Sequence, residues 1–282
     1  MKALRRFFPM VMAMVLLGIP EASALTIVTR YIGGEAPANA AGAGNLPDIV
    51  AAAARIWEAA YADPVTITIQ FGWAPVGDAG THTLIAQGGS PNREITGLIL
   101  FDNSGAARFY LDPTPDSDEE YRRRTEEYQD LGGGFVNVAR IFGGSVGDAA
   151  GRTDLLSVVI HEIGHALGMC AANLAFMQEG VDGAIRIGDG LPHAGTMIPL
   201  ASNRTGITSH FDPLEITYGS VMSGIGGDER RIPSALDILA NAQVSGFTVL
   251  SLAPQQISRP RGSASSGVGR AASGTVTERT SR

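Results

Sequence analysis

Apolar and polar positions in the first 111 residues predict a strand, a helix and further strands. Residues 25–31 (LTIVTRY) predict a first strand, and residues 65–73 (VTITIQFGW) alternate apolar and polar side chains, which favours a second. Between them, apolar residues recur at helical spacing over residues 46–62, which predicts an amphipathic helix. Residues 94–102 (EITGLILFD) and 108–111 predict two more strands.

The second half of the chain is less regular, apart from two helices. Residues 112–130 are charged and rich in tyrosine, and we expect an exposed loop with a helical turn there. A long apolar helix begins near Thr153 or Asp154, either of which is suited to cap it. A Gly-rich, weakly periodic stretch follows residue 170, and a last helix begins at Ser234. Strands alternating with helices before one long buried helix predict a layered α/β or α+β domain.

Both ends of the chain differ from its body. Residues 1–24 combine a basic start, an apolar stretch over residues 7–19 and small residues at 22–24, which is typical of a bacterial secretory signal peptide. We therefore expect a secreted or periplasmic protein; an uncleaved anchor is the alternative. Residues 253–282 are rich in Ser, Gly, Ala and Arg, which predicts a disordered basic tail. No later segment is long and apolar enough to predict a transmembrane helix.

Charge and cysteine content exclude several classes of protein. The net charge is −7; residues 1–24 carry +2 and residues 253–282 carry +4, so residues 25–252 carry −13. An acidic body argues against a nucleic-acid partner, which requires a basic face. The single cysteine, Cys170, excludes a disulfide framework and a four-thiolate metal site.

The segment SVVIHEIGHALGM contains the pattern HExxH, formed by His161, Glu162 and His165. Positions i and i+4 lie on one helix face, about 5–6 Å apart at Cβ, so both imidazoles reach one zinc ion at about 2.0–2.1 Å. Glu162 lies about 100° round the helix from His161 and is placed to act on a metal-bound water as general base. The surrounding residues are apolar, and burying these polar groups without a partner would be costly. The pattern therefore predicts a zinc site.

The third protein ligand is not given by this segment. Gly168 extends the pattern to HExxHxxG, the opening of the metzincin signature, and suits a sharp turn at the helix end. The usual third ligand would fall at position 171, where the chain has Ala171. Four candidates for the third ligand remain: His210, His193, and the carboxylates of Asp212 and Glu215.

His210 lies in SHFDP, and Met222 follows in GSVMSG. This pairing of a delayed histidine and a Met-containing turn resembles the leishmanolysin-like branch of the metzincin zinc metalloproteases, with a cysteine-poor bacterial relative as the closest type. The resemblance covers His161 to Met222. It implies zinc held by His161, His165 and His210, with Met222 packed beneath the metal.

The resemblance also implies a fold and an activity. We expect an α+β metzincin-like zincin domain over residues 25–252, with a mixed twisted sheet over the buried active-site helix, an insertion at 170–209, and a C-terminal subdomain with the Met-turn and a final helix. The implied activity is a zinc-dependent endopeptidase acting on a peptide or protein substrate. By resemblance, the substrate would lie along an edge strand at Thr96–Phe101.

Two other functions fit the same pattern: a zinc hydrolase of another class, such as an amidase or a peptidoglycan hydrolase, or a non-enzymatic surface protein with a structural metal site. An intact Glu162 argues against the last. Individual residues also have simpler interpretations: Met222 and Tyr218 as packed core, His210 as a surface residue, and Cys170 as a small buried hydrophobe rather than a zinc-inhibiting thiolate. An acidic group could bind calcium or form a solvated loop; its members are Asp112, Asp116, Asp118 and Glu119.

Overall fold

The protein has an α+β fold, seen in a computed structural model that describes residues 24–203, 206–216 and 219–254. The expected signal peptide, except Ala24, and the expected tail beyond residue 254 lie outside the described residues, as does Tyr218. In the described part of the chain, every helix is too short or too polar to cross a bilayer.

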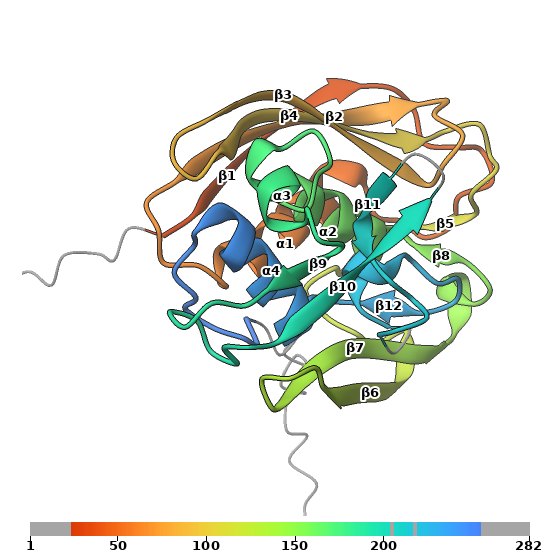
Figure 1. Ribbon diagram of the computed structural model, residues 1–282. Coiled ribbons are helices and arrows are strands. Elements are labelled where there is room, and N and C mark those ends of the chain that lie inside the picture. Colours follow the sequence, from red (N-terminus) through yellow and green to blue (C-terminus); the bar gives the residue numbers. More distant parts are fainter. Residues whose placement is uncertain (1–23, 204–205, 217–218, 255–282) are drawn as a thin grey trace, which may run out of the picture.

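One layer is a four-stranded mixed sheet with the order β1-β2-β4-β3, which arches over the helices in Figure 1. Its strands are β1 (Thr26–Gly33), β2 (Thr66–Ala74), β4 (Arg93–Asp102) and β3 (Gly80–Gly88). The first three run parallel, and β3 pairs antiparallel with β4. The strands predicted over residues 25–31, 65–73 and 94–102 are thus confirmed to within two residues.

Strand β3 was not predicted, and it changes which strand forms the edge of the sheet. Because β4 has β2 on one side and β3 on the other, Thr96–Phe101 lies inside the sheet. The expectation that this segment is the edge strand is therefore wrong, and β3 occupies that edge. The residue pattern of a strand reports which face is buried, not which neighbours pair with it.

Helices α1 (Leu46–Glu58) and α2 (Leu155–Ala166) pack beneath the sheet, and α4 (Ala235–Ser245) packs against the strand β7 (Phe135–Ser145). The side chain of Asp154 caps α2 by accepting from the backbone N–H of Ser157 at 3.0 Å, which confirms one of the two predicted caps. Helix α4 begins with Ser234 as its cap, as predicted. Helix α1 ends four residues before the predicted end at residue 62, because Tyr61 instead forms a β-bridge with Val249.

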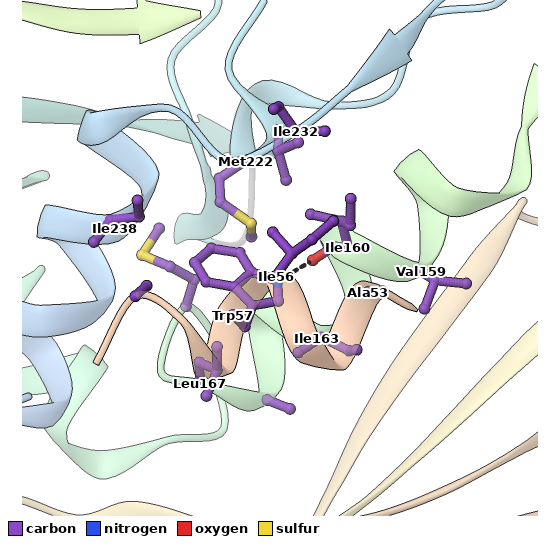
Figure 2. Close-up of a cluster of buried hydrophobic side chains, with 14 of the residues drawn as sticks. Ala53, Ile56, Trp57, Val159, Ile160, Ile163, Leu167, Met222, Ile232 and Ile238 are labelled. Atoms are coloured by element: carbon purple, nitrogen blue, oxygen red, sulfur yellow. Dashed lines mark hydrogen bonds between the residues drawn. The ribbon is translucent and has the colours of Figure 1, made fainter. Parts of the chain in front are cut away.

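Helix α2 is buried on all sides, which is why its sequence is apolar almost throughout. The indole Nε1 of Trp57 in α1 donates to the backbone carbonyl of Ile160 at 3.0 Å, which joins the two helices inside the apolar cluster of Figure 2. Ile56 and Ile163 are fully buried in the same cluster. These contacts hold α2 in one position relative to the sheet.

A second layer is the three-stranded sheet β12-β7-β6, at the bottom of Figure 1. Its strands are β12 (Arg230–Arg231), β7 (Phe135–Ser145) and β6 (Tyr121–Asp130), all paired antiparallel. The exposed loop predicted over residues 112–130 is therefore wrong for its second half. Most of β6 is exposed on both faces, so its residues lack the alternation of a half-buried strand, and it forms through backbone pairing with β7.

Residues 170–209, the predicted insertion, contain a short helix and parts of a third sheet. These elements are α3 (Leu174–Glu179), β9 (Ala184–Arg186) and β10 (Met197–Asn203), with β11 (Gly206–Phe211) completing the order β11-β10-β9. The remaining elements are the parallel pair β5 (Phe109–Tyr110) and β8 (Thr153–Asp154), and two one-turn 3-10 helices, η1 (Gly147–Ala149) and η2 (Val221–Ser223). The strand predicted over residues 108–111 thus shortens to two residues in β5.

A fully buried arginine links several of these elements at the start of α2. The guanidinium of Arg230 binds the carboxylates of Asp154 and Asp112 and the carbonyl of Ser117, and it stacks 4.9 Å from the ring of Tyr121. Asp112 is therefore a buried ion-pair partner, which corrects both its expected place in a solvated loop and its candidacy as a calcium ligand. The same Asp154 that pairs with Arg230 also caps α2.

Replacing Arg230 with methionine is expected to destabilise the protein by about 3–5 kcal/mol, because two buried carboxylates would lose their counter-charge. Urea unfolding monitored by circular dichroism measures this loss. The control is Arg55→Met, which removes an ion pair with Asp116 whose side chains are 48% and 63% exposed and should cost at most about 1 kcal/mol. Equal losses in the two variants would contradict this account.

Candidate metal centre

Helix α2 places His161, Glu162 and His165 within one turn of each other, and all three side chains are buried. The Nε2 atoms of His161 and His165 lie 3.0 Å apart. Their rings meet nearly at right angles, with centroids 4.6 Å apart. The helical period thus brings the two imidazole nitrogens to one point above the helix.

His210, on β11, completes a group of three histidines. Its Nε2 lies 3.2 Å from that of His161, and one nitrogen from each of the three rings lies within 4.8 Å of the others. Among the described residues, this is the one group of three or more His, Cys, Asp or Glu side chains with metal-ligand spacing. The sequence alone left His210 as one of four candidates for this place.

The other three candidates lie outside this group. His193 occupies the turn between β9 and β10, where its φ angle is 56° and its carbonyl accepts from the N–H of Thr196. The carboxylate of Asp212 accepts from the N–H of Leu214. Glu215 belongs to the same loop, where its carbonyl accepts from Gln129.

Backbone carbonyls orient two of the three imidazoles. The Nδ1 of His161 lies 2.8 Å from the carbonyl oxygen of Val221, and the Nδ1 of His165 contacts that of Met169. A carbonyl only accepts, so each Nδ1 donates its hydrogen, and the lone pair of each Nε2 faces its neighbours. Hydrogen bonds of this kind, from the ring nitrogen that faces away from the metal, fix the tautomer of metal-binding histidines.

Gly168 makes the contact between Met169 and His165 possible. Its φ angle of +151° favours glycine, and a Cβ there would lie 2.7 Å from the Oγ of Ser245 in α4. The chain therefore turns sharply just after α2 and places the carbonyl of Met169 on the ring of His165. The sharp turn expected at Gly168 is present.

The electrostatics of the three histidines favour their neutral form. Burial, aided by the neighbouring His210, lowers the pKa of His161 to about 4. Burial also lowers the pKa of His165 well below its ordinary value, and that of His210 below its ordinary value. Neutral imidazoles with converging lone pairs are the form that binds a metal ion.

The donor set fits a tetrahedral zinc ion. Nitrogens at about 2.0–2.1 Å from a tetrahedral zinc lie about 3.3 Å apart. The observed separations of 3.0 Å and 3.2 Å are close to this value. Without a cation, acceptor lone pairs would face one another in a buried site, which is unfavourable. His161, His165 and His210 are therefore the residues that could hold a metal here.

Glu162 lines the same cleft of about 470 Å³ as the three histidines. Burial, with Asp78 nearby, raises the pKa of Glu162 to about 7, although His82 opposes the shift. A carboxyl group with this pKa is suited to both accept and return a proton near neutral pH. Strand β3 approaches closely, since a Cβ on Gly80 would lie 2.8 Å from the Oε1 of Glu162.

Met222 is fully buried and packs against α2 and Trp57, as Figure 2 shows, and it directly follows Val221, whose carbonyl contacts His161. A Cβ on Gly164 would lie 2.5 Å from the Sδ of Met222, so a glycine in this helix turn makes room for the thioether. The backbone N–H of Met222 donates to the carboxylate of Asp237, which also binds Ser220. Asp237 thereby holds the turn in place from α4.

Sequence analysis missed a buried pair next to the histidines. The Nε2 of His82, on β3, lies 2.9 Å from a carboxylate oxygen of Glu94, and its ring stacks 6.2 Å from that of His165. Burial alone would lower the pKa of His82, but hydrogen bonds with Cys170 and Glu94 raise it to about 9. The buried Cys170 is therefore a hydrogen-bonding neighbour of this pair rather than only a small hydrophobe. Only the contact between β3 and β4 reveals the pair.

Two more of the acidic candidates pair with neighbouring side chains. Asp116 pairs with Arg55 at 2.8 Å, and Glu119 accepts from Thr114 at 2.6 Å and from Ser117. These contacts account for the acidic segment as a surface turn.

Comparisons of the chain with protein-family models, curated proteins and solved structures found no match.

Proposed function

We propose that this chain is an exported zinc-dependent endopeptidase of the metzincin type. The observation that carries the proposal is the convergence of three neutral histidine nitrogens in a cleft that also contains Glu162. A purely structural metal site has no use for a buried carboxylate of raised pKa beside its ligands. The sharp turn at Gly168 and the buried Met222 packed against α2 add support.

In this proposal, each residue of the centre has a distinct role. His161, His165 and His210 would hold the zinc ion, which when bound supplies a Lewis acid and a water of lowered pKa. Glu162 accepts a proton from the attacking water and returns it to the leaving amine of the peptide bond. Asp237 and Met222 keep the floor of the site fixed.

The position of β3 at the edge of the sheet is a further reason to propose a peptide as the substrate. The first residues of β3, including Gly80 and His82, line the cleft beside Glu162. Within the described residues, one side of β3 has no partner strand. An extended peptide that adds to this edge gains backbone hydrogen bonds, while side-chain pockets provide specificity. An antiparallel peptide would have its N-terminal residues near the C-terminal end of β3.

Protein purified with supplementary zinc is expected to contain about one zinc ion per chain. A strong chelator should remove the ion, abolish hydrolysis and lower the unfolding temperature, because metal binding stabilises the folded state. Elemental analysis and thermal unfolding, with and without zinc restored, measure these effects. Zinc content well below stoichiometric would count against the proposal.

A digest of an unbiased peptide library, with casein as a general substrate, tests the activity itself. Cleavage of internal peptide bonds by the zinc-loaded protein, lost on chelation, supports the endopeptidase. Full zinc occupancy without peptide cleavage would favour the alternatives, and hydrolysis of peptidoglycan or simple amides would then identify a hydrolase of another class. The Glu162→Gln protein, purified in parallel, excludes a contaminating protease.

A further inference from the structure

A second cavity of about 500 Å³ lies between α3 and β11. Its lining is mostly apolar, and the side chains that define it are Ala171, Phe176, Met177, Val181 and Ile207. We refer to it as the α3 pocket. Neither the metal centre nor the packing of the core requires such a cavity.

The rim of the α3 pocket exposes large apolar side chains to water. Met177 is 51% exposed and Val181 is 69% exposed. Leu174, on the same short helix, is 53% exposed. Contiguous exposed apolar surface of this kind marks a binding site more often than an isolated exposed residue does.

The α3 pocket lies next to the cleft that contains the histidines. The same two chain segments contribute to the cleft and to the pocket. Cys170 and Ser209 line the cleft, while Ala171 and Ile207, close to them in sequence, line the pocket. The N–H of Ala171 donates to the Oγ of Ser209 at 2.7 Å, which joins these segments. Along β11, the step from Ile207 to His210 is three residues, or about 10 Å.

Strand β3 connects the same two places. Its first residues line the cleft, and Gln87 near its end binds the start of α3, accepting from the N–H of Leu174 at 2.9 Å and donating to the carbonyl of Ala172 at 3.0 Å. An extended peptide lying antiparallel to β3 therefore runs from the metal centre toward α3 in its N-terminal direction. The distance of about 10 Å between Ile207 and His210 along β11 corresponds to about three residues of such a peptide, at about 3.3 Å per residue.

From this arrangement we infer that the α3 pocket binds a large apolar side chain of the substrate, about three residues before the cleaved bond. This inference rests on the proposed peptidase function and names its substrate class: extended peptides with an aliphatic or aromatic residue at that position. The charged and polar groups lie in the cleft around Glu162, while the pocket wall is apolar, so the two cavities select different parts of one peptide.

The test uses fluorogenic peptides that differ at one position, with leucine or aspartate about three residues before the cleaved bond. The wild-type protein should prefer leucine by about tenfold or more in kcat/KM. Val181→Lys should reduce this ratio about 3- to 10-fold, because it replaces apolar lining with a cation that favours aspartate. The exposure of Val181 makes loss of the fold an unexpected outcome, and circular dichroism checks it.

The matched control is Leu250→Lys, the same kind of change at a side chain that is 64% exposed and lies beside the end of α1. It should leave the leucine-to-aspartate ratio unchanged. A Val181→Lys ratio within twofold of the wild-type ratio would overturn the assignment of the pocket. A preference found only after the cleaved bond would overturn it as well.

Binding of the same peptides to the Glu162→Gln protein, measured by fluorescence anisotropy, separates this inference from the proposed function. Tighter binding of the leucine peptide, weakened by Val181→Lys, supports the pocket even if no peptide is hydrolysed. Hydrolysis without any effect of Val181→Lys on either readout would leave the peptidase standing and reject the pocket.

Discussion

Replacing Glu162 with glutamine is expected to lower turnover of a peptide substrate by about 100- to 10,000-fold, which is the usual contribution of a general base. Glutamine has nearly the same shape as glutamate but cannot accept the proton. Glu162 does not belong to the group of residues with metal-ligand spacing, so the zinc content of the variant should be unchanged. The neutral form of Glu162 is already favoured by burial, which raises its pKa to about 7, so the amide should be accommodated without loss of the fold.

Steady-state kinetics, elemental analysis and thermal unfolding of the same preparation measure these three quantities together. Glu35→Gln provides a matched control, because Glu35 is exposed and lies outside the cleft. It should retain wild-type turnover. If Glu162→Gln keeps more than about a tenth of wild-type turnover, another residue is the base.

Replacing His210 with alanine is expected to weaken zinc binding by at least about 100-fold. Removing a ligand should cost more affinity than removing a group that only hydrogen-bonds to a ligand, a loss that is typically about 10–100-fold. The Nε2 of His210 lies 3.2 Å from that of His161, so its loss leaves two converging nitrogens where a catalytic zinc requires three protein ligands. Competition with a chromogenic chelator measures the change in affinity.

His193→Ala is the control for this experiment, since it removes the same type of side chain from the turn between β9 and β10. Zinc affinity should stay nearly at the wild-type value. A large loss of affinity in His193→Ala, or an unchanged affinity in His210→Ala, would reject the assignment of the third ligand and with it the leishmanolysin-like resemblance. The zinc-hydrolase proposal would survive either result.

Features that depend only on neighbours along the chain could be predicted from the sequence. The spacing of His161 and His165 places both on one helix face, because the helical period is a local property of the backbone. The cap at Asp154, the start of α4 at Ser234 and the positions of strands β1, β2 and β4 follow from equally local preferences. The sharp turn at Gly168 likewise follows from the conformational freedom of one residue.

Tertiary structure decided which distant residues meet these local features. His210 meets His161 across 49 positions because β11 pairs with β10 and returns beside α2. From the sequence, only the Met-containing turn that follows His210 favoured it over His193. The edge of the sheet was assigned to the wrong segment, since β3 adds outside β4 and nothing within Thr96–Phe101 records that neighbour. The exposed loop expected before residue 130 became β6 for the same reason.

The buried polar pairs could not be predicted from the sequence. His82 with Glu94 and Arg230 with Asp112 and Asp154 each join residues from different elements. A charged side chain in a sequence favours a solvent-exposed position, and only a partner brought in by the fold reverses that preference, because burial is tolerated when the charge is paired. The helix that carries His161, Glu162 and His165 can thus be predicted from the local spacing of residues. The third histidine, the edge strand proposed to bind substrate and the buried charged pairs depend on pairing between distant parts of the chain.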